Sequence, residues 1–218
     1  MSAVGAYTRL RSLDAPVITT GEAAAALRVS DSSASRTLRT LATQGLLRRI
    51  RQGLWAVDGR ERDPRSVAAD LTRPYPAYIS FQSALAARGV IDQIPREFGV
   101  ASLGKPKRVQ TSLGTYAVHR LPPELFGDFE EKDGVALATV EKALFDALYV
   151  ACASGHPDRR LPELDLPADF SPKKVHAWIK RIASARLRTL VEAAVRRALE
   201  HAEYEDPHGP NRTSASAD

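Results

Sequence analysis

The stretch SDSSASRTLRTLATQGLLRRIRQGLWAV, residues 30–57, joins a helix-forming segment to a short hairpin. Ser30 is a typical N-cap residue, and Gly45 supplies the left-handed residue that commonly ends a helix. The sequence therefore predicts a helix from Ser30 to about Gln44. Its inward face consists of apolar residues at helical spacing, which are Ala34, Leu38 and Leu41.

The second half of this stretch, LLRRIRQGLWAV, alternates apolar and basic residues. It contains a Gln52-Gly53 pair, which is typical of a tight turn between two strands. We therefore expect a β-hairpin over residues 47–57, with Trp55 in the core.

The segments before residue 30 predict two further helices. In residues 3–13, apolar residues at helical spacing predict one buried stripe, made of Val4, Tyr7, Leu10 and Leu13. Thr19 and Glu22 have the spacing of a capping box for a second, Ala-rich helix. Only three or four residues separate this helix from the next, which is typical of a helix-turn-helix. Followed by a hairpin, the pattern predicts a winged helix-turn-helix domain over residues 1–60.

The net charge of +5 is confined to this predicted domain. Residues 1–60 hold nine basic and four acidic side chains, whereas the other 158 residues hold 22 of each sign. Such a local excess of positive charge indicates a surface for a polyanion. A basic face kept only for solubility is the alternative reading of the charge.

Duplex DNA is the polyanion that this pattern favours. A major groove admits one α-helix, and Arg, Ser and Thr side chains reach base edges or phosphates there. Arginines on a hairpin contact the backbone or enter a minor groove. The predicted DNA-binding residues are Ser32, Ser33, Ser35, Arg36, Arg39, Thr40, Arg48, Arg49, Arg51 and Gln52. Alternatively, the serines only cap the helix and the arginines only solvate its surface.

The rest of the chain predicts a mixed α/β domain over residues 61–205, so the expected fold class is α+β. Ser80 is the expected cap of a helix that Gly89 ends, and Thr139 that of a helix over about 140–153. Strands are expected in EFGVAS, KRVQTS, GTYAVHRL and GVALAT, and two more helices after residue 170. The last of these helices has an apolar stripe that packs either internally or against a second subunit. Residues 206–218 have the composition of a disordered tail.

Several segments, in this order, resemble the AbiEi family of antitoxins from type IV toxin-antitoxin systems. They are ITTGEAAAALRVSDSSASRTLRTLATQGLLRRIRQGLWAV, AYISFQSALAARGVIDQIPREFGVAS, LGTYAVHRLPPELF and GVALATVEKALFDALYV, and they span about residues 17–150. The family pattern TPEKALLDL appears here as TVEKALFDAL, with Val140 in place of proline. The helices after residue 170 do not align with the family.

The resemblance implies a winged-helix domain that binds inverted-repeat operator DNA and represses its own operon. Residues 30–44 would be the recognition helix and residues 47–57 the wing, acting as a monomer or a dimer on the repeats. The resemblance also implies that the second domain counters a nucleotidyltransferase-like, AbiEii-like toxin. Whether it does so by direct contact stays open.

We expect no catalytic activity, cofactor or metal. The five histidines are scattered without ligand spacing, Cys152 has no activating neighbours in sequence, and no GxSxG, phosphate-binding loop or dinucleotide fingerprint is present. Glu141, Lys142 and Asp146 are interpreted as charges on an exposed helix face. The chain has no apolar run that could span a membrane and no signal peptide, so a cytoplasmic location is expected.

Two other functions remain open at this stage. One is a winged-helix transcriptional regulator whose second domain senses a ligand. The other is a protein-interaction module whose basic face meets an acidic protein.

Overall fold

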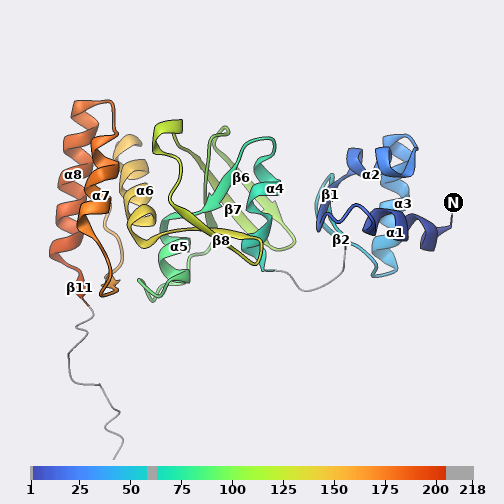
Figure 1. Ribbon diagram of the computed structural model, residues 1–218, viewed down its shortest axis with the longest axis horizontal. Helices are drawn as coiled ribbons and strands as arrows, with labels where there is room; N and C mark the ends of the chain where they lie inside the picture. The colour runs from blue at the N-terminus through green and yellow to red at the C-terminus, as the bar shows by residue number, and fades with distance from the viewer. Residues whose placement is uncertain (1, 58–62, 205–218) are drawn as a thin grey trace, which may run out of the picture.

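The computed structural model describes residues 2–57 and 63–204, and it shows a mixed α and β fold arranged in two lobes (Figure 1). The smaller lobe contains the elements up to residue 57, and the larger lobe those from residue 63. The predicted tail, residues 206–218, lies outside the described residues, as does the segment 58–62.

Three helices and a three-stranded antiparallel sheet form the smaller lobe. The helices are α1 (Ala3–Arg11), α2 (Thr20–Leu27) and α3 (Asp31–Thr43). The strands are β1 (Val17–Thr19), β2 (Arg48–Arg51) and β3 (Leu54–Ala56), in the order β1-β3-β2. The helices, the hairpin and the short connection between α2 and α3 were all expected from the sequence.

The predicted end signals of α2 and α3 are confirmed. Thr19 and Glu22 form a capping box in which both hydrogen bonds are present. The Ser30 hydroxyl accepts a hydrogen bond from the Ser33 amide, and Gly45 has a φ of 72°. Both signals are local in sequence, which explains why they could be read without the fold.

The predicted stripe of α1 is wrong in part. Val4 and Leu13 are exposed, and the buried residues of this helix are Ala6 and Leu10. Ala6 lies in one core cluster with Ala23 of α2, so small side chains rather than Val4 make this contact.

A six-stranded mixed sheet forms the centre of the larger lobe, in the order β6-β7-β5-β4-β9-β8. Its strands are β4 (Ala77–Ile79), β5 (Phe98–Ser102), β6 (Lys107–Thr111), β7 (Gly114–Arg120), β8 (Phe129–Lys132) and β9 (Val135–Ala138). The pairs β5/β7 and β4/β9 are parallel, and the others are antiparallel. The predicted strands β5, β6, β7 and β9 are confirmed, whereas β4 and β8 were not expected.

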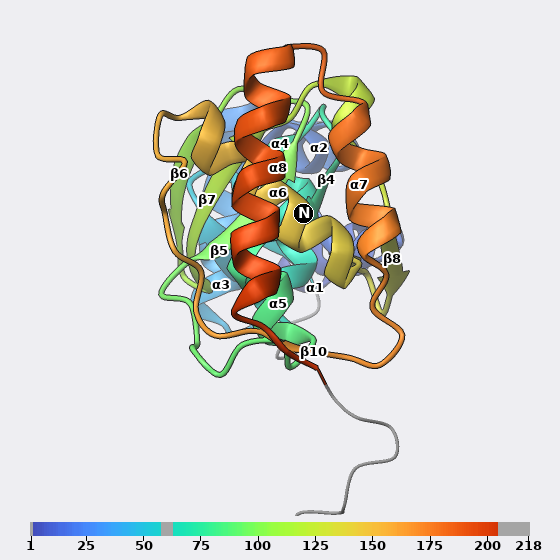
Figure 2. The ribbon, with the colours of Figure 1, turned by 90° about the vertical axis from the view of Figure 1, so that its left-hand side faces the viewer.

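Helices cover this sheet in layers (Figures 1 and 2). Helix α6 lies next to the sheet, and α7 and α8 lie outside it at the end of the molecule remote from the smaller lobe. The helical elements are η1 (Pro64–Val67), α4 (Ala68–Thr72), α5 (Phe81–Ala87), η2 (Pro123–Leu125), α6 (Val140–Ala153), α7 (Pro172–Lys180) and α8 (Ala185–Glu200). Two short strands, β10 (Asp165–Leu166) and β11 (Glu203–Tyr204), pair in parallel.

Part of the apolar stripe of α8 packs internally. Val191, Ala194 and Val195 are buried in the core of the larger lobe. Cys152 of α6 is also buried there, as expected of a small apolar helix residue. None of the described helices is both long enough and apolar enough to cross a membrane.

The two lobes share part of one apolar core. The small sheet buries Ile18 and Trp55 against α1, α2 and α3, whereas its other face buries Ile50 and Leu54 in the cluster of the larger lobe. Alternation of side chains along the strands produces these two faces. The small sheet is therefore covered on both sides.

Candidate nucleic-acid interface

Helix α3 presents a polar face because its apolar residues all point the other way. Ala34, Leu38 and Leu41 have no solvent exposure and pack in the core of the smaller lobe. An amphipathic helix fixed in this way turns its remaining side chains to solvent.

The predicted residues of α3 lie on this solvent-facing side. Ser32, Ser33, Arg36, Arg39 and Thr40 are exposed, and Ser35 is half-buried. The Arg39 Nε donates to the Ser35 carbonyl at 3.2 Å, so this arginine lies back toward the start of the helix. The helix start itself carries three hydroxyls in mutual contact, with Ser30 Oγ at 3.0 Å from Ser32 Oγ and 3.1 Å from Ser33 Oγ.

Hydrogen bonds with Thr20 hold the hairpin of β2 and β3 beside the start of α3. Gly53 has a φ of 77°, which its turn requires, and its carbonyl accepts a hydrogen bond from the Thr20 amide at 3.0 Å. The Trp55 indole is buried and donates to the Thr20 hydroxyl at 3.1 Å. The Arg49 guanidinium lies 5.7 Å from the centre of the Trp55 ring, which places its charge beside the hairpin turn.

A hollow of about 460 Å³ separates the first turns of α3 from the hairpin turn. It brings together half of the predicted DNA-binding residues, which are Ser32, Ser35, Arg39, Arg49 and Gln52. Asp31 also lines it and contributes one negative charge. The other five predicted residues, Ser33, Arg36, Thr40, Arg48 and Arg51, do not line this hollow.

Hydrogen bonds from the larger lobe hold the backbone of the hairpin of β2 and β3. The Ser112 amide, in the turn between β6 and β7, donates to the Ile50 carbonyl at 2.9 Å, and its hydroxyl donates to the Arg49 carbonyl at 3.0 Å. Arg51 is exposed, and its charge together with burial lowers the pKa of Lys107, with burial the larger cause. The side chains of Arg49 and Arg51 thus stay at the surface while their backbone is fixed.

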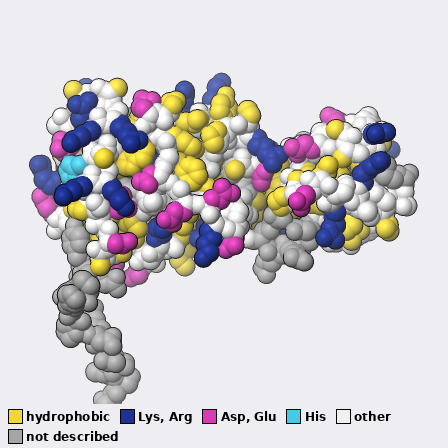
Figure 3. Space-filling view, in the orientation of Figure 1, with side chains coloured by type: hydrophobic (Ala, Val, Ile, Leu, Met, Phe, Trp, Pro, Cys, Tyr) yellow, Lys and Arg dark blue, Asp and Glu magenta, His cyan; other side chains and the backbone are white. Residues whose placement is uncertain are grey.

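Charge over the larger lobe is mixed rather than segregated. On the face shown in Figure 3, basic and acidic side chains are interspersed over this lobe. This agrees with the balance of 22 basic and 22 acidic residues after residue 60. The net positive charge of the chain therefore falls within residues 1–60.

The interpretation of Glu141, Lys142 and Asp146 as exposed charges is wrong. All three are buried, and Lys142 and Asp146 have no solvent exposure. The Lys142 ammonium donates to an Asp146 carboxylate oxygen and to the Leu125 carbonyl, and it lies 4.4 Å from the centre of the Trp178 ring. The Glu141 carboxylate accepts from the Ser171 amide at 3.0 Å.

Asp146 is the centre of this buried network. Its second oxygen accepts from the Tyr78 hydroxyl at 3.0 Å and from the Ser80 hydroxyl at 2.7 Å. Ser80 is the N-cap residue of α5, as expected, but its hydroxyl donates to Asp146 and makes no cap hydrogen bond. Burial raises the pKa of Asp146 and lowers that of Lys142. Because the network is buried, a substrate has no access to it, and its role is to stabilise the packing of α6.

Among the described residues, no group of three or more His, Cys, Asp or Glu side chains is placed to hold a metal ion.

A scan against protein-family models matches no family, and a search of curated proteins finds no similar protein.

Proposed function

We propose that the chain is a DNA-binding antitoxin whose first 60 residues form a winged helix-turn-helix. In this proposal α3 enters the major groove of operator DNA, and the hairpin of β2 and β3 contacts the adjacent backbone. The observation that carries it is the exposed arginine and hydroxyl face of α3, which lies beside a basic hairpin in the segment that holds the whole net charge.

The DNA-binding part is tested by the double variant Arg36→Ala/Arg39→Ala. We expect each arginine to contribute about 1–3 kcal/mol if it reads a base, so the double variant should lose most specific binding. Fluorescence anisotropy with a duplex from upstream of the gene, over a salt series, measures this. Wild-type affinity should fall steeply with salt, because binding releases counterions from phosphates.

The matched control is Arg9→Ala/Arg11→Ala. It removes the same charge from the same lobe, at two exposed positions of α1. If it weakens binding as much as the α3 variant does, the effect is one of net charge and α3 is not the recognition helix. Wild-type affinity in the α3 variant would contradict the proposal directly.

The antitoxin part of the proposal rests on the resemblance of residues 17–150 to the AbiEi family. It requires a nucleotidyltransferase-like reading frame beside the gene. Co-expression with the product of that frame should restore growth, and co-purification would show whether the larger lobe contacts the toxin.

A second candidate is a transcriptional regulator that responds to a small molecule. A cavity of about 350 Å³ in the larger lobe favours it. Absence of a toxin-like neighbouring gene would favour this candidate over the antitoxin.

A further inference from the structure

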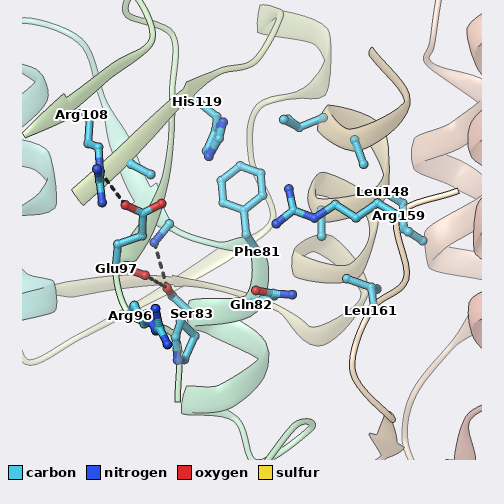
Figure 4. Close-up of a pocket in the computed structure, with 16 residues that line it drawn as sticks. Phe81, Gln82, Ser83, Arg96, Glu97, Arg108, His119, Leu148, Arg159 and Leu161 are labelled. Carbon is cyan, nitrogen blue, oxygen red and sulfur yellow. Dashed lines mark hydrogen bonds and ion pairs between the residues drawn. The ribbon is translucent and has the colours of Figure 1, made fainter. Parts of the chain in front are cut away.

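One cavity of the larger lobe opens where α5 begins, between strands β5 and β7, helix α6 and the loop that follows α6 (Figure 4), and a larger hollow adjoins it at Leu148, Arg159 and Leu161. The volume of the cavity, about 350 Å³, is that of a site for a small molecule. None of the predicted DNA-binding residues lines it.

One side of the cavity carries two rings, tilted by 56° to one another, and two apolar side chains. The Phe81 and His119 rings lie against each other with centroids 4.7 Å apart, and Leu148 and Ala151 are buried beside them. Burial lowers the pKa of His119, the charge of Glu97 opposes this and that of Arg159 adds to it, so the pKa lies below its ordinary value and the uncharged imidazole is favoured. Such a surface favours a planar ring over a flexible or charged group.

Arginines lie on both sides of Phe81. Three of them line the cavity, and among the described residues only Arg108 has a carboxylate partner, Glu97, at 2.9 Å. In Figure 4 the side chain of Arg159 reaches toward Phe81 from the loop after α6, and Arg96 lies near Glu97. Neither Arg96 nor Arg159 is joined to a carboxylate among the residues drawn. The cavity thus carries more positive than negative charge.

Phe81 has a backbone conformation that is unfavourable for a bulky residue. Its φ is 59°, in the left-handed region that bulky residues avoid. Gly99 beneath it has no room for a side chain, because an added Cβ would lie 2.9 Å from Phe81 Cδ2 and 3.1 Å from the Ser80 carbonyl. The neighbouring Ser80 is bonded to buried Asp146. Strain of this kind, maintained by a buried network, is typical of functional sites.

We propose that this cavity binds a small anion whose carboxylate or phosphate is attached to a flat ring. The ring packs on Phe81, His119 and Leu148, and the anionic group is bound by Arg159. Guanidinium groups suit either anion, because their paired N–H donors match both carboxylate and phosphate oxygens.

The hairpin of β6 and β7 lines the cavity. It also contacts the hairpin of β2 and β3, which is the candidate DNA-binding hairpin. Arg108 lies on β6 and His119 on β7, and the turn between these strands donates from Ser112 to the carbonyls of Ile50 and Arg49. Ligand binding that moves β6 and β7 therefore changes the position of Arg49. This coupling rests on the proposed function, whereas the ligand site itself does not.

Isothermal titration of the full chain tests the site with three probes: 4-hydroxybenzoate, AMP and inorganic phosphate. We expect one of the two ring-bearing anions to bind, and phosphate to bind at least about tenfold more weakly. Arg159→Gln should weaken the ring-bearing probe by about tenfold or more. The control Arg160→Gln removes an equal charge from the next exposed residue, which does not line this cavity, and should leave binding unchanged.

Three results would overturn the ligand site: binding of neither ring-bearing probe, phosphate binding as tightly as the ring-bearing probe that binds, or equal losses in the two arginine variants. The coupling is measured separately, as operator affinity with and without the bound probe. Ligand binding without any change in operator affinity would overturn the coupling but not the ligand site. Ligand binding by a chain that does not bind DNA would instead overturn the proposed function.

Discussion

Lys142 and Asp146 lie one turn apart on α6, and their partners come from three other parts of the larger lobe. Lys142 contacts Leu125 of η2 and the Trp178 ring of α7, and Asp146 contacts Tyr78, the middle residue of β4. Two buried charges are costly to desolvate, and only a complete set of partners offsets that cost. The pair therefore fixes how α6 packs against its neighbours.

Removal of one member of this pair should destabilise the protein far more than removal of both. Lys142→Met leaves the Asp146 carboxylate buried without its cation, and we expect a loss of about 3–5 kcal/mol in the free energy of unfolding. The double variant Lys142→Met/Asp146→Leu removes both charges and should recover part of this loss. Urea denaturation measures both. A single variant within about 1 kcal/mol of wild type would show that the pair does not stabilise the fold.

The burial of these charges had one signal in the sequence. Apolar residues lie on every side of α6, among them Leu144, Phe145 and Leu148, and a helix that is apolar all round is buried. Lys142 and Asp146 also have the i, i+4 spacing of an ion pair. The partners at Tyr78 and Ser80 could not be foreseen, because the fold brings them together across more than sixty residues.

At the level of elements, the start of α2 combines a local cap with a contact between the lobes. The Glu22 carboxylate accepts from the Thr19 amide at 2.6 Å and from Arg73, in the larger lobe, at 2.9 Å. Burial by itself raises the pKa of Glu22, but the hydrogen bonds from Thr19 and the charge of Arg73 outweigh it, so the pKa lies below its ordinary value. The ionised form is therefore favoured in the folded protein.

A lowered pKa in the folded state means that Glu22 stabilises the protein above its unfolded pKa, and that this contribution is lost as the pH falls through the folded pKa. We expect Glu22→Gln to open α2 more easily at pH 7 and to differ less from wild type near pH 3, because protonation of the wild-type carboxyl at low pH removes its charge. Hydrogen exchange of the α2 amides at the two pH values measures this. A difference that persists unchanged at low pH would contradict a role for the carboxylate charge.

Elements with local signals could be predicted, and those defined by distant partners could not. The caps at Thr19, Ser30 and Thr139 and the turn glycines are short-range features, and they placed the helices correctly. Strand β4 has only three residues, and β8, with the sequence FEEK, is exposed along its whole length. β4 is buried but too short to show a strand pattern, and β8 has no hydrophobic pattern. Their neighbours in the sheet define them: β5 and β9 for β4, and β9 for β8.

At the scale of the whole molecule, the small sheet is the element that joins the two lobes. Side chains of β2 and of the residue just before it point alternately into two cores. Leu47 packs with α1, α2 and α3, whereas Ile50 packs with the larger lobe. The sequence indicated the alternation but not the second core, because nothing local distinguishes a face covered by another lobe from one that faces water. A fragment that lacks residues 1–60 would expose the surface that Ile50 and Leu54 cover, so point variants test the interface more cleanly than deletion does.

Ile50→Thr should loosen the contact between the lobes without unfolding the smaller one. Threonine keeps the branched shape but places a hydroxyl in an apolar contact, which costs about 1–3 kcal/mol. If the lobes separate locally, the Ser112 amide loses its Ile50 acceptor, and its hydrogen exchange should accelerate by about tenfold or more. The amides of Leu38 and Leu41 should keep their protection. Leu47→Thr, the matched change on the opposite face, should produce the reverse pattern, and identical patterns for the two variants would show that the small sheet does not separate two cores.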